Sequence, residues 1–225
     1  MDWSPLYISI KTSILATIIT FFIGILVSYK MAMYKGKFKG LIDGLLTISL
    51  ILPPTVIGFF LLLILGKNSI LGKVLFSFDK NIIFTWSATV ISAVVVSFPM
   101  MYRTSRSAFE QIDDNIILSA RTLGLSELKI FTKIAIPLAY PGIIGGTVLS
   151  FARALGEFGA TLMIAGNIPG KTQTMPVAIF FAVESGDMNK AMTWVIMIIL
   201  ISFFMIIMLN YWSDKQQKII GKRLK

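Results

Sequence analysis

Five long runs of apolar residues recur along the chain and are separated by short polar connections. They cover residues 12–29, 45–65, 82–102, 138–165 and 192–212. An α-helix needs about 20 apolar residues to cross the hydrocarbon core of a bilayer, and each run is long enough. The pattern therefore predicts an all-α fold, a polytopic membrane helical bundle of about five transmembrane helices.

A sixth apolar stretch, residues 174–183, is about half the length that a membrane span requires. It also has Pro176 close to its start. Non-helical or broken backbone at membrane depth is tolerated only where protein or a water-filled cavity covers it. We therefore expect this stretch to be a re-entrant or surface segment on the outer side.

Composition supports a membrane protein. Hydrophobic residues make up 56% of the 225 residues and the mean hydropathy is +0.81, whereas soluble domains are roughly 45–50% apolar. We expect one transmembrane domain over residues 1–225. The absence of cysteine and histidine excludes disulfides, thiol catalysis and the commonest zinc sites. No basic segment precedes the first apolar run, so we expect it to remain as a span rather than to be removed as a signal peptide.

The distribution of basic residues predicts the orientation. The net charge is +10, but lysine and arginine alternate with apolar runs instead of gathering on one face, which argues against nucleic-acid binding. Fourteen of the 21 lie in segments 30–39, 103–133 and 215–225, and five lie in segments 67–80 and 171–190. Short cytoplasmic loops hold an excess of basic residues. We therefore expect a multi-pass protein of the cell membrane with its N-terminus outside and its C-terminus in the cytoplasm.

Residues 165–172, AGNIPGKT, approach the pattern of a phosphate-binding loop, with Ala165 in place of the first glycine. Such a loop needs a β-strand before it and a helix after it, so that backbone N–H groups point at the phosphates. Here an apolar helix precedes it, and the predicted topology places it outside the cell. We expect no ATP binding by this chain, so any ATP hydrolysis belongs to a separate subunit.

The longest polar segment on the predicted cytoplasmic side, 103–133, has the pattern of a helix, a glycine turn and a second helix. Asp113 or Asp114 can cap the first helix and Gly124 can end it in a left-handed conformation. Ser126 can cap the second, which we expect to end at Pro137. Two interpretations remain open: an amphipathic connector resting on the lipid surface, or a helix whose apolar side docks in a groove on a soluble partner.

The fourth apolar run contains two charged residues, Arg153 and Glu157, on one helix face. A lone charge at the bilayer centre costs about 2.5–3.5 kcal/mol on translocon scales, so both should face protein or water. Two interpretations remain open. The two charges neutralise each other, or Arg153 supplies positive potential along a transport pathway while Glu157 fixes the position of Arg153. Small residues recur over 142–160, which favours close helix packing, and Pro53 and Pro54 predict a kink.

The polar segment resembles the cytoplasmic EAA loop of membrane subunits of binding-protein-dependent ABC importers. That loop reads Glu-Ala-Ala, three residues, Gly, nine residues, then Ile-x-Leu-Pro, and this chain keeps every spacing, with Leu118 and Ser119 replacing the first two residues and Ile136 replacing leucine. The resemblance implies that the loop docks on an ATP-binding subunit. The residues it assigns to coupling are Leu118, Ser119, Ala120, Arg121, Gly124, Leu125, Ile134 and Pro137.

Three further blocks, residues 52–59, 97–113 and 151–179, resemble the permease subunits of molybdate importers, to which sulfate and tungstate permeases are related. The resemblance implies ATP-driven import of a tetrahedral oxyanion by a homodimer that works with two ATP-binding cassette subunits and an extracytoplasmic solute-binding protein. This chain would bind no cofactor and catalyse no reaction, and ATP and Mg²⁺ would be used by the partner subunit. The pathway residues it implies are Arg153, Glu157, Phe158, Gly159 and Thr161.

Two other classes of function remain as alternatives. A membrane-embedded enzyme is disfavoured because the apolar runs contain no metal-ligand cluster, no nucleophile with a base and no paired carboxylates. A channel or secondary transporter that works without ATP is disfavoured by the docking segment. Neither alternative explains the helix, turn and helix at residues 113–137.

Overall fold

The computed structural model describes residues 2–77 and 81–223, and over these residues the chain is helical without a β-strand. Lys80 and Lys225, which entered the prediction of orientation, lie outside the described residues. The elements are α1 (Ser4–Met33), α2 (Lys39–Thr47), η1 (Ile48–Leu50), α3 (Pro54–Leu65), α4 (Ile70–Ser77), α5 (Trp86–Glu110), α6 (Asp114–Thr122), α7 (Glu127–Ile130), η2 (Phe131–Ala135), α8 (Ile136–Leu155), α9 (Gly159–Ala165), α10 (Met175–Glu184) and α11 (Met188–Arg223).

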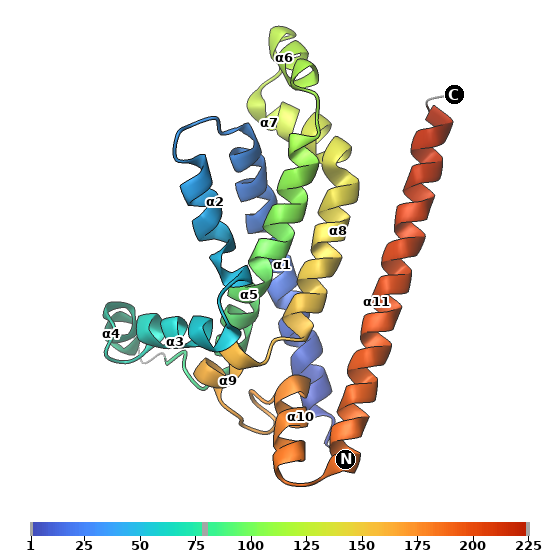
Figure 1. Cartoon of the computed structure of the whole chain (residues 1–225). Coiled ribbons are helices and arrows are strands. Elements are labelled where there is room, and N and C mark those ends of the chain that lie inside the picture. Colours follow the sequence, from blue (N-terminus) through green and yellow to red (C-terminus); the bar gives the residue numbers. More distant parts are fainter. Residues whose placement is uncertain (1, 78–80, 224–225) are drawn as a thin grey trace.

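Three helices, α1, α5 and α8, form the centre of the molecule (Figure 1). They approach closely because glycine stands at their contacts. A Cβ added at Gly24 would lie 2.7 Å from Met101 Cγ, and one at Gly146 would lie 3.2 Å from Met101 Sδ. Small residues are what allow helix backbones to pack in lipid, where apolar burial gives no advantage. The predicted close packing of the fourth apolar run is confirmed.

Buried hydroxyl groups connect the same helices. Thr12 on α1 lies 3.0 Å from Thr89 on α5, and Thr20 on α1 lies 3.0 Å from Ser150 on α8. Ser150 also donates to the backbone oxygen of Ser97 at 3.3 Å. Hydroxyl pairs of this kind hold helices together within a membrane. The central bundle therefore combines close backbone contact with specific polar bonds.

The second apolar run does not form one straight span. The helical pair Lys39–Leu50 and Pro54–Leu65 bends by 107°. The kink predicted from Pro53 and Pro54 is therefore confirmed, but the bend is too sharp for one span over 45–65. Pro53 is extended, with φ −54° and ψ 140°, because the residue before a proline is disfavoured in the α-helical region. Figure 1 shows α3 and α4 projecting sideways from the bundle, and we call α2, η1 and α3 the bent limb.

The fourth apolar run, 138–165, is also interrupted. α8 ends at Leu155 and α9 begins at Gly159, so the predicted continuous helix to residue 165 is wrong. At the other end, helix continues from Glu127 to Leu155, so the second helix of the polar segment does not end at Pro137. Pro137 has no N–H to donate to the carbonyl of Lys133, four residues earlier. Lys133 lies in the π-helical turn η2, and the helix continues past the missing bond.

Three described helices are long and apolar enough to span a membrane, or four if the bent limb counts as one. The three are α1, the helix Glu127–Leu155 and residues Met188–Met208 of α11. The predicted third span, 82–102, corresponds to α5, which is not among them. The short α10 agrees with the expectation that 174–183 is no full span.

The contact between α5 and α8 gives a test of the packing. A Cβ at Gly142 would collide with the Ala108 side chain, whereas one at Gly145 would meet only Thr104 Cγ2 at 3.9 Å. Overpacking of this kind typically costs about 1–3 kcal/mol. We expect Gly142→Ala to lower the thermal unfolding temperature in detergent by about 2–4 °C per kcal/mol lost. Gly145→Ala, one turn away, is the matched control, and equal shifts for the two variants would contradict this packing.

Candidate functional site

The helix, turn and helix that the sequence predicts is present at the end of the bundle (Figure 1). Asp113 accepts a hydrogen bond from the backbone N–H of Asn115 at 2.8 Å and so caps α6. Gly124 ends the turn after α6 with φ +78°. Ser126 occupies the cap position of α7 but makes no side-chain capping bond, so this detail of the prediction is wrong.

The turn at Gly124 is a Schellman motif. The N–H of Leu125 donates to the carbonyl of Ala120 at 3.2 Å, and the N–H of Gly124 donates to the carbonyl of Arg121 at 2.9 Å. An added Cβ at Gly124 would meet no atom within 4 Å. The need for glycine therefore comes from the left-handed backbone and not from lack of space.

A bidentate ion pair closes the same turn. Arg121 donates through Nε to Glu127 Oε1 at 2.7 Å and through its terminal nitrogen to Oε2 at 3.1 Å. These hydrogen bonds raise the pKa of the Arg121 guanidinium above its usual value. Both side chains are exposed, so the pair adds little stability by itself. The two-point geometry of this ion pair and the glycine turn together fix the angle between α6 and α7.

Only part of the apolar surface of α6 faces the protein. Ile117 and Ala120 are buried against Ile130 of α7. The large apolar side chains of this segment that remain exposed are Ile116, Leu118, Leu123, Leu125 and Leu128. The outward apolar face is what a docking helix requires, although a face resting on lipid would look the same.

Several residues predicted for coupling gather around one hollow. A shallow hollow of about 420 Å³ is lined by Asn115, Ile116, Ser119, Ala120, Leu123, Leu125 and Ile134. Ser119, Ala120, Leu125 and Ile134 belong to the predicted set. Leu118 and Arg121 also lie on α6, and Gly124 lies in the turn after it. Pro137 lies farther along, in the first turn of α8. The structure thus brings most of the predicted residues together.

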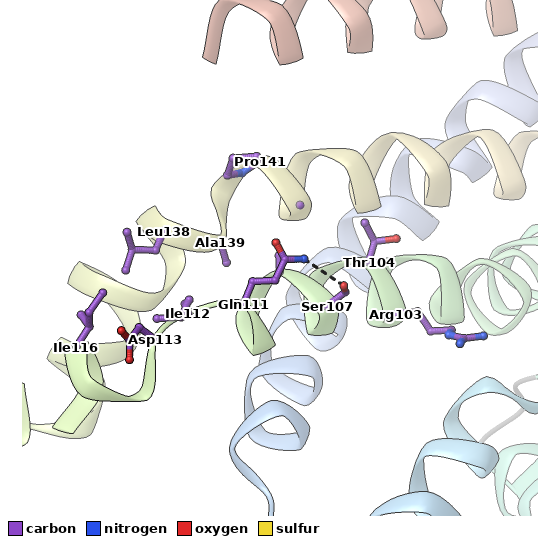
Figure 2. A pocket seen from close by; sticks show the side chains of 12 residues that line it. Arg103, Thr104, Ser107, Gln111, Ile112, Asp113, Ile116, Leu138, Ala139 and Pro141 are labelled. Carbon is purple, nitrogen blue, oxygen red and sulfur yellow. Dashed lines mark hydrogen bonds between the residues drawn. The ribbon is translucent and has the colours of Figure 1, made fainter. Parts of the chain in front are cut away.

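A larger groove, of about 770 Å³, lies beside this segment between α5 and α8 (Figure 2). One wall is a polar face of α5 that includes Arg103, Thr104, Ser107 and Gln111, and Gln111 donates to Ser107 at 3.4 Å. The opposite wall comes from α8 and includes Pro141. The sequence analysis did not single out this groove, although the four-residue spacing of polar side chains on α5 indicates a hydrated face.

The residues predicted for the pathway lie at the interruption between α8 and α9. Glu157 is 2% exposed and its Oε2 lies 2.8 Å from Arg153 Nη1. Its other oxygen accepts the backbone N–H of Ala160 at 2.8 Å, so the carboxylate also holds the first turn of α9. A buried carboxylate needs such partners, because an isolated buried charge is costly.

The remaining predicted pathway residues contact three other helices. Thr161 shares a hydrogen bond of 2.8 Å with Ser92 of α5. Gly159 lies against α3, since an added Cβ would be 3.1 Å from Pro54 Cβ. Phe158 occupies the cap position of α9 and its ring centroid lies 5.2 Å from that of Phe180 on α10. The five predicted residues therefore lie where α8 gives way to α9, at the end of α8 opposite α6 (Figure 1).

The stretch that approaches a phosphate-binding loop has a different structure. It follows α9 and precedes α10, with no strand in the described residues. The backbone N–H groups of Lys171, Thr172 and Gln173 all donate to the carbonyl of Ile168, at 2.9–3.2 Å. Because these donors are used within the turn, they do not form a cradle for phosphate. No group of three or more metal-ligating side chains occurs in the described part of the chain.

Sequence reasoning missed the hydroxyl residues of α1 that face the bundle. Ser9, Thr12, Ser13, Thr17 and Thr20 are all buried, and Ser9 accepts the backbone N–H of Met175 at the start of α10, at 2.7 Å. Their spacing of three and four residues is a signal for one polar helix face. It was available in the sequence, within a run that reads as uniformly apolar.

Comparison with known proteins assigns the family. Residues 11–223 match the family described as binding-protein-dependent transport system inner membrane component. The chain is 43% identical over 205 residues to the putative molybdenum transport system permease protein YvgM of Bacillus subtilis strain 168. The aligned region covers 91% of this chain and 90% of that protein. It is 39% identical over 202 residues to the molybdenum transport system permease protein ModB of Escherichia coli K12, which covers 88% of each.

A sulfate transport system permease protein, CysT of Salmonella typhimurium LT2, is 30% identical over 215 residues, covering 95% of this chain and 78% of that protein. Among solved structures, the MetNI methionine ABC transporter has a TM-score of 0.71 at 12% identity, with 94% of each chain covered. A bacterial ABC transporter for alginate import has a TM-score of 0.75 at 13% identity, covering 94% of this chain and 78% of that one. These structures show a shared fold.

The match over nearly the whole chain, the identity to permease proteins and the shared fold agree. The chain belongs to the family of binding-protein-dependent transport system inner membrane components, the permease subunits of ABC transporters.

Proposed function

We propose that the chain is the permease subunit of an ATP-driven importer that carries a tetrahedral oxyanion, molybdate, into the cell. The observation that carries the proposal is the connected helix, Schellman turn and helix at residues 113–130, which presents an exposed apolar face beside a hollow. The relatives at 43% and 39% identity are molybdenum transport system permease proteins, one of them putative, and they indicate the substrate. Sulfate is the second candidate, because a sulfate permease is 30% identical.

The partners follow from this assignment. Two copies of the chain would enclose the pathway, two ATP-binding cassette subunits would dock on α6, and a solute-binding protein would deliver the anion outside. A similar fold occurs in an alginate ABC transporter in complex with its periplasmic protein. ATP and Mg²⁺ would act on the cassette subunits alone. The N-terminus would lie outside, because α6 and the end of α11 lie at the opposite end of the bundle from the N-terminus (Figure 1).

In the proposed mechanism, α6 would transmit the movement of the cassette subunits to the bundle. ATP binding would bring the cassette subunits together and displace α6, and the rigid helices α5 and α8 would carry the movement to the interruption at Glu157. Rocking of packed helices between two arrangements is a common form of such transitions. Arg153 would supply positive potential to the oxyanion as it passes, while Glu157 holds the arginine in place.

The substrate and the need for ATP are tested by reconstitution. The chain would be assembled in proteoliposomes with its cassette subunits and solute-binding protein, and uptake of labelled molybdate would be measured with and without ATP. We expect uptake only with ATP and binding protein, and weaker competition by sulfate than by unlabelled molybdate. Transport by the chain without cassette subunits would contradict the proposal, and stronger competition by sulfate would favour the second candidate.

The docking role of α6 is tested at Gly124. Proline cannot adopt φ +78° and removes the N–H that bonds to Arg121, a change that costs about 3 kcal/mol or more in a helix. We expect Gly124→Pro to abolish uptake while membrane insertion persists. Gly124→Asn is the matched control, since asparagine tolerates the left-handed conformation, and it should keep most of the uptake. Normal transport and ATPase coupling in the proline variant would disprove the docking assignment.

The Arg153–Glu157 pair is tested by separating charge balance from function. Glu157→Ala leaves the half-buried Arg153 without its partner and removes the bond to the Ala160 N–H. We expect a loss of stability below the about 3–5 kcal/mol of a fully buried pair, because the Arg153 side chain is 28% exposed. The double variant Arg153→Gln with Glu157→Gln has no unpaired charge, so we expect its thermal stability to recover. Its molybdate uptake should stay low, because the positive potential is gone. If uptake recovers together with stability, the pair is structural only.

A further inference from the structure

Three ion pairs join the cytoplasmic end of the bundle in a regular series, and neither the coupling loop nor the pathway accounts for them. One side of the series lies on the α1–α2 connection and α2, and the other lies on α5 and the first residue of α6. The pairs are Lys35 with Asp114 at 3.0 Å, Lys39 with Glu110 at 3.0 Å, and Asp43 with Arg106. We call these six residues the charge ladder.

The spacing of the ladder defines its register. Successive members on each side are four residues apart, and the two sides run antiparallel, as two helix faces do when they pair. The signs read plus, plus, minus on the α2 side and minus, minus, plus on the other. A slip by one step would set Lys39 against Arg106 in one direction, or Asp43 against Glu110 in the other. Each slip creates a like-charge pair, so one alignment is favoured.

The inner end of the ladder is reinforced. The Asp43 side chain is 31% exposed and that of Arg106 is 18% exposed, whereas those of Lys35 and Asp114 are 79% and 65% exposed. Tyr102, four residues before Arg106, donates its hydroxyl to Asp43 at 2.8 Å. Arg106 Nε also donates to Glu110 at 3.0 Å. Because partly buried, networked charges are screened less than exposed ones, the inner contacts dominate.

The bent limb depends on the ladder for its attachment at this end. No residue of α2 is fully buried, and of its apolar side chains only Ile42 and Leu46 are half-buried, so apolar packing contributes little to holding α2 against the bundle. Among the hydrogen bonds of the described residues, Ser49 of η1 adds one to the carbonyl of Val95 on α5, at 3.1 Å. An element held by polar contacts and not by a packed core can follow its partner without losing buried apolar area.

The far end of the bent limb contacts the proposed pathway. A Cβ added at Gly58 of α3 would lie 2.9 Å from Ala160 Cα, and one added at Gly159 would lie 3.1 Å from Pro54 Cβ and 3.2 Å from Thr55 N. These residues of α9 follow Glu157 directly. The ladder, α2, the bend at Pro53, α3 and α9 therefore form one chain of contacts from the start of α6 to the Arg153–Glu157 pair.

We propose that the charge ladder couples the end of α5, which leads into α6, to the bent limb, so that displacement of the docking helix moves α2 and α3 and thereby α9. The six residues are positioning residues, because they act through α3 and α9 and not by touching the anion. The proposal rests on the proposed function, since it requires cassette subunits that displace α6. It adds a second route of transmission beside the rigid helices α5 and α8.

The test inverts each half of the inner ladder. Lys39→Glu with Asp43→Arg inverts the α2 side, and Arg106→Asp with Glu110→Lys inverts the α5 side. Each half keeps the net charge but sets like charges against each other in both steps. All four substitutions together restore every opposite-charge contact, including the one within α5. Lys37→Glu, an exposed lysine outside the ladder, is the control on the same segment.

Uptake and ATP hydrolysis are measured on the assembled complex. We expect each half inversion to lower the ratio of molybdate imported to ATP hydrolysed by about tenfold, a common size for coupling between sites. The fourfold variant should restore the ratio, and Lys37→Glu should leave it unchanged. Normal ratios of import to hydrolysis in both half inversions would overturn the proposal. A fourfold variant that fails to restore an assembled complex would also overturn it. If a half inversion does not assemble, the neutral variant Lys39→Gln with Asp43→Asn must show the same loss of coupling.

A distance measurement separates this proposal from the choice of substrate. The chain has no cysteine, so Leu41→Cys on α2 and Thr122→Cys on α6 are its two spin-label sites. Because the complex would hold two copies, the labelled chain is diluted with unlabelled chain so that the distance within one copy is measured. We expect this distance to stay constant between nucleotide-free and nucleotide-bound complexes, and to change in a half-inverted complex. If the distance changes between the two nucleotide states in a complex with the native ladder residues, the proposed coupling is wrong, even if molybdate is imported. A constant distance in a complex that does not import molybdate would leave the ladder standing and refute the proposed substrate.

Discussion

The structure depends on the close approach of α1, α5 and α8 in an environment where apolar burial gives helices no reason to associate. Gly24 and Gly146 let two helices reach Met101 of the third, and hydroxyl pairs such as Thr20 with Ser150 add directional bonds. Polar groups within lipid must find partners in the protein. This requirement converts three apolar helices into a bundle with one register, from which the other elements extend.

The two candidate sites lie at opposite ends of that bundle. α5 leads directly into α6, and α8 leads in the other direction into the interruption before α9. The Schellman turn at Gly124 and the pair between Arg121 and Glu127 give α6 a fixed angle. At the far end, Glu157 binds both Arg153 and the first turn of α9. The proposed mechanism requires this arrangement, with a rigid core between the docking helix and the charged pair.

Much of this was predictable from local signals. The Asp113 cap and the left-handed Gly124 follow from residue types with strong positional preferences, and both are confirmed. The kink at Pro53 and Pro54 was predicted, but not the size of the bend, 107°, because hydropathy measures length and not direction. The break in the fourth run, at Gly156–Phe158, was not predicted. The contacts between α2 and α5 were also beyond the sequence, since partners such as Asp43 and Arg106 are far apart in the chain.

Sidedness is the central claim, because the docking helix and the ATP it depends on must share a compartment. Single cysteines at Lys129 and Lys171, both exposed, can be labelled in intact cells with a membrane-impermeant maleimide, since the chain has no cysteine of its own. The account predicts that Lys171→Cys reacts from outside while Lys129→Cys reacts only after the membrane is permeabilised. Equal labelling of both positions in intact cells would contradict it.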